Sequence, residues 1–462
     1  MYIYDSHLKK KVLFEPVNKD RVSIYVCGPT VYDDAHLGHA RSSIVFDLLR
    51  RVLVELGYKV IFVKNFTDID DKIIKKMQET NSSLKDITTH YIKRYKEDMH
   101  ALNVLDADIE PKATQTLKEI ISMTDTLLQN GCAYRLEDGI YFDTSKDDKY
   151  LSLSGRYEDK NLQNRVECHI GKKDQKDFAL WKFSKIAEPS FDAPFGDGRP
   201  GWHIECSAMI KKHIAGEGEY QIDIHGGGAD LLFPHHENEA AQTRCSFHQK
   251  LAKYWIHNSF VNINGEKMSK SLGNSFFIKD ALKVYDGEIL RFYLLSTHYR
   301  QNFNFNEEDL LVSKKRLDKI YRLKKRIYPC EISKTGKEFK NKLLEALSDD
   351  LNISKALSII EDMINKANEK LDANAKDKTL KKELAANLEF ISKVLGIGSK
   401  DSFEYFQIGV TKEEKKLIET LINKRNEAKK EKNYKVADKI REELLSMGIK
   451  IMDTIKGTKW EK

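Results

Sequence analysis

The chain has 462 residues, of which 40% are hydrophobic and 32% charged, and it carries 78 Lys and Arg against 71 Asp and Glu. At ~150 residues per domain this length corresponds to about three domains, which excludes a peptide module or a fibrous repeat. No apolar run approaches the ~18 residues of a membrane span, and charge near the start disfavours an export signal, so we expect a cytoplasmic protein.

The net charge of +7 is too small to indicate a nucleic-acid partner by itself. The distribution of the charge is more informative, because residues 314–326 hold eight basic residues and one acidic residue. The six cysteines are widely separated and include no CxxC pair. A disulfide framework is therefore disfavoured, and we expect metal ligation or plain burial.

The beginning of the chain predicts a β-α-β unit. The predicted strand, helix and strand cover residues 22–26, 36–56 and 59–64. Ligands of such units bind at the carboxyl ends of the strands. We therefore expect Cys27, residues 36–39 and Thr67 to converge.

A turn-rich, β-containing stretch interrupts this pattern, and proline-free helical spacing follows Pro329. These features predict an α/β fold, in which a Rossmann-like, doubly wound parallel sheet with an inserted subdomain precedes an α-helical bundle and a small C-terminal mixed domain. The predicted ranges are 1–119 and 201–305 for the two halves of the sheet domain, 120–200 for the insertion, 306–400 for the bundle and 401–462 for the end domain.

Two short motifs have chemistry suited to a nucleotide. His36-Leu-Gly-His39 begins the predicted helix, where backbone donors and the helix dipole attract phosphate. Lys267-Met-Ser-Lys-Ser271 places two lysines on a short loop, as a triphosphate clamp would require. Alone, the first is better explained by surface histidines near a helix cap, and the second is also typical of a solvated basic turn. Together and in this order they match the paired signatures of class I aminoacyl-tRNA synthetases.

A third group of residues suggests a metal site. If residues 235–239 are helical, His235 and Glu239 share one face, and with Cys27 and Cys206 they supply two thiolates, an imidazole and a carboxylate, which fit zinc. The spacing alone does not establish this site, because isolated cysteines are more often small buried hydrophobes. His236 would point about 100° away from His235, so we assign it to packing or to a supporting role.

The chain closely resembles the cysteinyl-tRNA synthetases. The matching segments are Cys27–Asp33, His36–His39, Asn65–Asp71, Gly201–Met209, His225–Gly228, Phe233–Glu239 and Lys267–Asn274. The resemblance implies ATP-dependent activation of L-cysteine to cysteinyl-adenylate, and transfer to the 3′-terminal adenosine of tRNA(Cys). It also implies one zinc ion per chain, which selects the cysteine thiolate over serine, and Mg²⁺ accompanying ATP.

The same resemblance assigns roles residue by residue. Zinc is expected at Cys27, Cys206, His235 and Glu239, and cysteine at Gly28, Thr67, Trp202 and His225. His36, His39 and Lys270 are expected to bind ATP, and these three together with Lys267 are the expected catalytic groups. Without the resemblance, core packing explains Trp202 equally well, and a tight turn explains His225–Gly228.

The basic segment 314–326 is interpreted as a surface for the tRNA backbone. Candidate anticodon contacts in the tail, where a solvated helix face is the plainer explanation for most, are Lys429, Tyr434, Asp438, Asp453 and Trp460. We expect a monomer that contacts no membrane.

Two other functions stay open at this point. A relative of the catalytic domain could join cysteine to a small amine acceptor, although the extended helical and terminal domains argue against it. A catalytically silent RNA-binding protein could retain the same architecture, but both signatures and all four zinc positions are intact here.

Overall fold

The computed structural model describes residues 1–462 except 158–170, 187, 264–265, 268–275, 331–335 and 455–456. The chain forms two compact units. The first comprises residues 1–313, 341–360 and 394–396, and the second comprises 314–340, 361–393 and 397–462. Among the described residues, none of the helices has the length and apolar character needed to cross a membrane.

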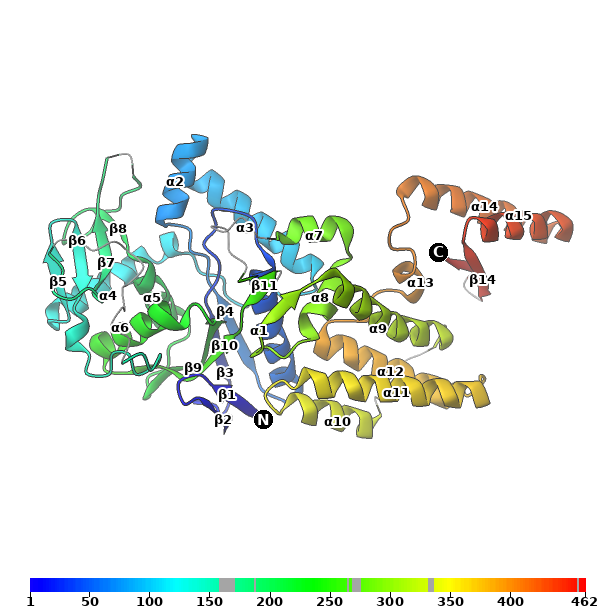
Figure 1. The fold of residues 1–462 in the computed structure, drawn as a ribbon, viewed down its shortest axis with the longest axis horizontal. Coiled ribbons are helices and arrows are strands. Elements are labelled where there is room, and N and C mark those ends of the chain that lie inside the picture. The colour runs from blue at the N-terminus through cyan, green and yellow to red at the C-terminus, as the bar shows by residue number, and fades with distance from the viewer. Residues whose placement is uncertain (158–170, 187, 264–265, 268–275, 331–335, 455–456) are drawn as a thin grey trace. The chain divides into compact units, whose positions relative to one another are not determined.

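A four-stranded parallel sheet organises the first unit (Figure 1). Its strands, in spatial order, are β10 (Lys250–Asn258), β9 (Tyr220–Gly228), β3 (Val22–Val26) and β4 (Val60–Lys64). Every residue of β3 is buried, and its largely β-branched and aromatic sequence suits a strand covered on both faces. The predicted parallel sheet is confirmed.

The sheet has its switch point between β3 and β9. The chain adds β4 on one side of β3, and later β9 and β10 on the other. Helix α1 (Leu37–Glu55) connects β3 to β4, and it packs so closely that a Cβ on Gly226 would lie 2.2 Å from the Phe46 ring. Just past β3, the backbone N–H of Cys27 donates to the carbonyl of Gly226 (3.1 Å). The carboxyl ends of β3 and β9 therefore open at one edge, where ligands of such sheets bind.

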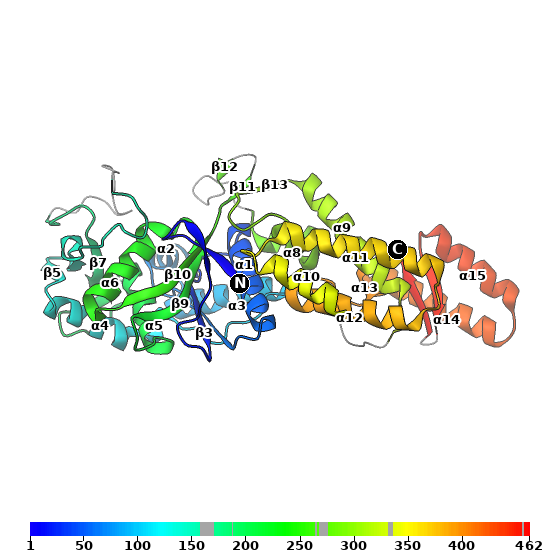
Figure 2. The same cartoon turned by 90° about the horizontal axis from the view of Figure 1, so that it is seen from below.

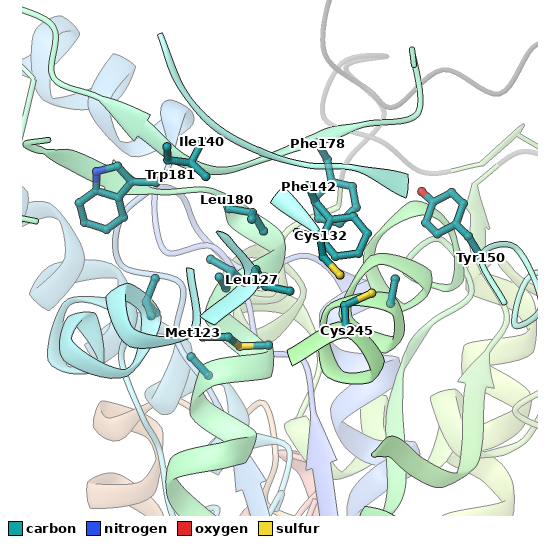
Figure 3. Close-up of a cluster of buried hydrophobic side chains, with 14 of the residues drawn as sticks. Met123, Leu127, Cys132, Ile140, Phe142, Tyr150, Phe178, Leu180, Trp181 and Cys245 are labelled. Atoms are coloured by element: carbon teal, nitrogen blue, oxygen red, sulfur yellow. The ribbon is translucent and has the colours of Figure 1, made fainter. Parts of the chain in front are cut away.

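An antiparallel sheet is inserted between β4 and β9 along the chain. Its strands are β5 (Ala133–Leu136), β6 (Gly139–Phe142), β7 (Phe178–Phe183) and β8 (Gly198–Pro200), and α4 (Leu117–Gln129) precedes them. Figure 3 shows side chains from α4 and this sheet, among them Leu127, Phe142 and Trp181, in one buried cluster. Ile204 of α5 (Trp202–His213) and Ala241 of α6 (Glu237–Phe247) belong to the same cluster. The insertion therefore shares its core with two helices that border the sheet edge.

Further helices and strands complete the chain up to residue 305. They are β1 (Tyr2–Asp5), β2 (Lys10–Leu13), α2 (Asp71–Thr80), α3 (Leu84–Ala101), β11 (Val261–Ile263), β12 (Glu266–Lys267), α7 (Ile278–Val284), α8 (Gly287–Leu295) and β13 (Phe303–Phe305). Arg291 of α8 is fully buried and donates to Asp47 of α1 and to the Leu395 carbonyl. This arginine ties α8 to α1 inside the first unit.

Helices dominate the rest of the chain, as the sequence predicts. They are α9 (Glu307–Arg326), α10 (Lys337–Leu347), α11 (Ile353–Ala373), α12 (Lys378–Leu395), α13 (Ser402–Tyr405), α14 (Lys412–Lys430) and α15 (Tyr434–Ser446). In both ribbon views α14 and α15 lie side by side (Figures 1 and 2), and the antiparallel strands β14 (Lys450–Thr454) and β15 (Gly457–Glu461) follow them. The five domain ranges stay predictions, because the division into compact units passes through α9, α10, α11 and α12.

The basic segment 314–326 lies on α9, and much of its charge is engaged within the second unit. Arg316 pairs with Glu361 (2.8 Å), Lys325 with Glu461 (2.6 Å) and Arg326 with Asp372 (2.5 Å). Lys324 donates to the carbonyls of residues 398 and 400. A surface that binds the tRNA backbone needs cations that can contact phosphate. Because these four cations already have partners within the second unit, fewer basic side chains are available for tRNA than the sequence count suggests.

Candidate active site and metal centre

Four donor side chains from separate parts of the chain meet at the sheet edge. Cys27 follows β3, Cys206 lies on α5, His235 lies in the short kinked turn Leu232–His236, and Glu239 lies in the first turn of α6. One donor atom from each lies within 4.8 Å of the donor atoms of the other three. Cys206, His235 and Glu239 are at most 1% exposed. The structure thus brings together all four residues that the sequence suggests as zinc ligands.

The distances between these donors suit a tetrahedral ion. Two atoms bound 2.0–2.3 Å from a tetrahedral zinc are about 3.3–3.8 Å apart. The Sγ atoms of Cys27 and Cys206 are 3.7 Å apart, and Cys206 Sγ is 3.6 Å from His235 Nε2. Glu239 Oε1 lies 3.6 Å from Cys27 Sγ and 3.0 Å from His235 Nε2. Three of these four distances match the edges of a zinc tetrahedron, and the fourth is somewhat short.

A second ring of side chains orients the donors. His225 Nε2 lies 2.8 Å from Glu239 Oε2, and His203 Nδ1 lies 3.0 Å from His235 Nδ1. The indole of Trp202 stacks on the His235 imidazole, with ring centroids 4.2 Å apart. Such outer contacts fix the orientation of metal-binding imidazoles and carboxylates. Trp202 and His225 therefore border the cluster, as a pocket for cysteine would require.

The charges of the cluster favour the deprotonated form of two of the four donors, Glu239 and Cys206. Burial would raise the pKa of Glu239, but the adjacent His225 and His235 outweigh it and lower the pKa to about 2. The hydrogen bond from Cys27 lowers the pKa of the Cys206 thiol to about 6, whereas burial raises the pKa of Cys27 itself. Metal ligands must be deprotonated, so a carboxylate and an acidic thiol already suit the cluster to a cation.

His236 lies closer to the cluster than a purely packing residue. Its Nε2 is 3.4 Å from Cys27 Sγ, and its Nδ1 is 2.8 Å from His257 Nε2. With Cys27, His225 and Glu239 it forms a second group of donors, which shares two members with the first. This contact fits the supporting role that the sequence analysis allowed for His236. Phe233 has an extended backbone, so the chain enters α6 through a kink and not as a continuous helix.

His36 and His39 form the first turn of α1 and cap it. His36 Nδ1 accepts from the backbone N–H of Gly38 (3.1 Å), and His39 Nδ1 accepts from the backbone N–H of His36 (3.2 Å). Their rings stack with centroids 3.8 Å apart. The pair therefore stands at the positive end of a 19-residue helix, a position that attracts phosphate.

The flanks of the two signature motifs meet in space. The backbone N–H of Leu37 donates to the carbonyl of Phe276 (3.1 Å), and that of Ile278 donates to the carbonyl of Ala35 (2.9 Å). The backbone of Lys267 lies in β12. Lys270 and the Lys267 side chain lie outside the described residues. A polyphosphate at the start of α1 would therefore lie beside the chain that follows the second motif.

Gly28 and Thr67 hold the ends of β3 and β4 together. The Gly28 N–H donates to Asn65 Oδ1 (2.8 Å), and a Cβ on Gly28 would lie 1.6 Å from the Asn65 carbonyl oxygen. The backbone of Thr67, which is 2% exposed, forms a bridge with Thr30. Cys27, the start of α1 and Thr67 therefore share one edge of the sheet, as the β-α-β pattern predicts.

Glu205 is a site residue that the sequence analysis missed. It lies on α5 beside Cys206, it is fully buried, and neither carboxylate oxygen has a hydrogen-bond partner among the described residues. The sequence offered one signal for its position: Glu205 follows Trp202 by three residues, and residues three or four apart share a helix face. The sequence alone does not show that this glutamate lacks a partner.

An ion network supports the approach of α7 to α1. Asp34 accepts from Arg94 Nε of α3 (3.2 Å) and from Lys279 Nζ of α7 (2.5 Å). Asp98, one turn further along α3, is 5% exposed, and its Oδ2 has no partner among the described residues. The network thus places the Asp98 carboxyl, one oxygen of which has no hydrogen-bond partner among the described residues, close to α7.

Replacing Asp98 by asparagine should stabilise the protein at neutral pH. Burial raises the pKa of Asp98 from 3.8 to about 6; Arg94 and Lys279 oppose this, and Asp34 and Glu97 add to it. Because the folded state has the higher pKa, Asp98 lowers stability as the pH rises from about 4 to 6. Asp98→Asn should gain about 1–2 kcal/mol at pH 7.5, less than the full shift corresponds to because solvent screens part of the charge, and almost nothing at pH 4. Thermal melts across this range test it, with the exposed neighbour Glu97→Gln as control; equal gains at both pH values would refute it.

Two of the candidate tRNA residues are engaged inside the second unit. The Asp453 carboxylate accepts from Arg425 (2.9 and 3.0 Å) and Lys429 (2.9 Å), and these contacts hold its pKa well below the usual range. Lys429 and Asp453 also border a hollow of about 490 Å³, which Asn426 and Thr458 help to line. The contacts fix these side chains in place without covering the hollow.

The other three tail candidates differ in exposure. Trp460 is 6% exposed and packs in a cluster with Ile418 and Leu444, so its ring is core and offers no stacking face in this structure. Amphipathic strand pairing explains this burial, since Trp460 lies on the inner side of β15. Tyr434 is 61% exposed at the start of α15, and Asp438 is exposed one turn later. Of these three, Tyr434 and Asp438 are open to a partner.

Comparison with known proteins agrees with this geometry. Residues 13–315 match the family of class I (C) tRNA synthetase catalytic domains, and residues 342–399 match the DALR domain. The chain is 65% identical to the cysteine–tRNA ligase of a Nitratiruptor species, over the whole of both chains. It is 63% identical to that of Aliarcobacter butzleri, covering 100% of this chain and 99% of the relative.

A solved structure shares the fold at low identity. It is Mycobacterium tuberculosis methionyl-tRNA synthetase in complex with methionyl-adenylate, which matches with a TM-score of 0.61 and 14% identity over 82% of this chain and 92% of that chain. This likeness concerns the fold alone. From its sequence relatives and its catalytic-domain match, the chain belongs to the cysteine–tRNA ligase family of class I aminoacyl-tRNA synthetases.

Proposed function

We propose that this protein is a cysteine–tRNA ligase that activates L-cysteine with ATP and transfers it to the 3′-terminal adenosine of tRNA(Cys), with zinc selecting the amino acid. Family membership supports the ligase activity. The observation that carries the zinc proposal is the pair of Sγ atoms 3.7 Å apart, beside a His235–Glu239 pair at the switch point of the sheet. Of the two overlapping donor groups, we favour the one that contains both thiols, because thiolate ligands prefer zinc.

Selection of cysteine against serine needs more than a shaped pocket. The two amino acids differ by one atom, and a hydrophobic pocket separates near-isosteres by only about 10²-fold. A preference of ~10⁴-fold corresponds to about 5.5 kcal/mol. When bound by Cys27, Cys206, His235 and Glu239, zinc would favour a thiolate over a neutral hydroxyl. Trp202, stacked on His235, would then close the pocket over the small side chain.

The activation step needs no protein nucleophile, because the carboxylate of cysteine attacks the α-phosphate and pyrophosphate leaves. His36 and His39 would bind ATP and donate to the charge that develops at the α-phosphate, aided by the N-terminus of α1. Lys267 and Lys270 would engage the pyrophosphate, and Mg²⁺ would accompany ATP. The contacts between residues 35–37 and 276–278 support this division of labour, since they bring the two motifs' flanks together.

Tyr434, Asp438, Lys429 and Asp453 remain our candidates for contacts with tRNA, with Tyr434 the most exposed. We further propose a cytoplasmic monomer. Light scattering on a sizing column tests whether the protein is a monomer, and a mass twice that of one chain would refute this proposal. Loss of charging after substitution of Tyr434, with pyrophosphate exchange intact, would place tRNA at α15.

Parallel charging of total tRNA with labelled cysteine and serine is the direct test of the function. We expect cysteine to be charged, serine to be rejected by ~10⁴-fold, and zinc to be present at about one per chain. If deletion from Thr411 left tRNA charging unchanged, the small-acceptor alternative would gain support. Absence of cysteine-dependent pyrophosphate exchange in zinc-loaded protein would favour the silent RNA-binding alternative.

Substituting Gly28 by alanine should impair activation through geometry. The new Cβ would lie 1.6 Å from the Asn65 carbonyl, so β3 and β4 must move apart at the edge that holds Cys27. A displacement of about 1 Å can cost ~10²-fold in rate, which is the expected fall in pyrophosphate exchange. Gly218→Ala is the matched control, because its Cβ meets nothing within 4 Å. Full activity of the Gly28 variant would show that this edge tolerates movement.

A further inference from the structure

Glu205 is a buried carboxylate without a partner beside the metal centre. It is 0% exposed, and neither of its oxygens accepts a hydrogen bond from the described residues. Glu237 provides a contrast, because it is equally buried but accepts from the backbone N–H of Ser154 (2.7 Å). A buried carboxylate with no donor is costly, and such groups in native proteins call for a ligand or an ion to explain them.

The position of Glu205 on α5 directs it toward the substrate pocket. Trp202, Glu205 and Cys206 stand at helix positions i, i+3 and i+4, so they share one face. The Thr67 hydroxyl, three residues past β4, approaches Glu205 as a weak donor, but no donor meets the distance and angle of a hydrogen bond to either Glu205 oxygen among the described residues. Glu205 is therefore bordered by residues proposed to contact cysteine or zinc, and it is not in either group of possible metal donors.

The surroundings of Glu205 favour a cation. Its strongest electrostatic neighbours are Cys206, Asp70 and Asp68, all of which are acidic. Asp68 and Asp70 already have donors, since Asp68 accepts from Thr114 and Asp70 caps α2 by accepting from Lys72 N–H. Glu205 differs from both, because neither of its oxygens has a hydrogen-bond partner among the described residues.

We propose that Glu205 receives the α-ammonium group of the amino acid substrate. The inference rests on the proposed function, in which the substrate thiol lies at the Cys27–Cys206 pair. The sulfur and nitrogen of cysteine are separated by only two carbon atoms, so a group beside Cys206 on the same helix face is well placed for the nitrogen. An ammonium carries three donors and no acceptor, which complements a carboxylate whose oxygens accept no well-formed hydrogen bond from the described residues.

A comparison of two ligands isolates this contact. L-Cysteine and 3-mercaptopropionate carry the same thiol and carboxylate, but only cysteine has the ammonium group. Calorimetry on the zinc-loaded full chain should give the wild-type protein a Kd for cysteine at least ~10²-fold below that for 3-mercaptopropionate, because a site built for a polar group rejects analogues that lack it. In Glu205→Gln the Kd for cysteine should rise ~10²-fold while that for 3-mercaptopropionate stays nearly constant.

Controls separate recognition from structural support. Glu237→Gln also removes a buried carboxylate, and it should leave the ratio of the two Kd values unchanged. Zinc content and the KM for ATP should stay near wild type in Glu205→Gln, while the KM for cysteine rises. If both ligands weaken equally in that variant, Glu205 supports the fold only and the proposal fails.

The wild-type measurement keeps the test decisive even if the variant does not fold. Equal affinity of the wild-type protein for cysteine and 3-mercaptopropionate would overturn the proposal without any substitution. Failure of the proposed function has a different signature, namely no cysteine-dependent pyrophosphate exchange by the wild-type enzyme. Exchange with an unchanged ligand ratio in Glu205→Gln would therefore reject the role of Glu205 alone.

Discussion

Cys206→Ser is expected to lose zinc and to lose discrimination against serine. Cys206 is 1% exposed, and its Sγ lies 3.7 Å from Cys27 Sγ and 3.6 Å from His235 Nε2, so this sulfur forms one corner of the proposed tetrahedron. A serine hydroxyl stays protonated and binds zinc weakly. After dialysis the variant should retain well below one zinc per chain, and its preference for cysteine should fall from ~10⁴-fold toward the ~10²-fold that a pocket alone provides.

The measurements are zinc content and parallel pyrophosphate exchange with cysteine and serine. Cys245→Ser is the matched control, because Cys245 is also a buried thiol but belongs to the core shared by α6 and the inserted sheet (Figure 3). The control should keep its zinc and its selectivity, whatever it loses in stability. A Cys206→Ser protein with full zinc and full selectivity would remove the metal from the proposed basis of selection.

The sheet and its edge could be predicted because their signals are local. The β-branched run before Cys27 and the four-residue spacing of the next helix determine the β-α-β unit, and such units bind ligands at one edge. The four proposed zinc ligands were identifiable by resemblance, although Cys27 and Cys206 are far apart in sequence. Their convergence depends on the switch point between β3 and β9, which no local pattern specifies.

The missed features all depend on partners that are remote in sequence. Glu205 has no hydrogen-bond partner among the described residues because no remote donor reaches it, and His236 contacts Cys27, which lies 209 positions away in the chain. The basic residues of α9 count as charge in the sequence, yet Arg316 is neutralised by Glu361, 45 positions away. Composition measures how much charge a segment has, whereas the fold decides how much of it is available.

His39→Gln should separate the capping contact of this histidine from the role in ATP activation that we propose for it. His39 stands at the third position of α1, and its Nδ1 accepts from the His36 N–H, which completes a capping box. Glutamine at this position can make the same capping contact, so the thermal midpoint should hardly change. It cannot replace the imidazole near the α-phosphate, and the loss of one such donor typically costs ~10²- to 10³-fold. Cysteine-dependent pyrophosphate exchange should fall by that factor, with zinc content unchanged.

Two further variants make the result interpretable. His39→Ala removes the imidazole and the cap together, so it should show the same fall in rate with an added loss of about 0.5–2 kcal/mol in stability. His90→Gln changes an exposed histidine of α3 and should alter neither quantity. If His39→Gln keeps its exchange rate while His39→Ala loses it together with stability, the contribution of His39 is the integrity of the helix start, and the charge at phosphorus must be met by His36, the helix N-terminus and the lysines of the second signature.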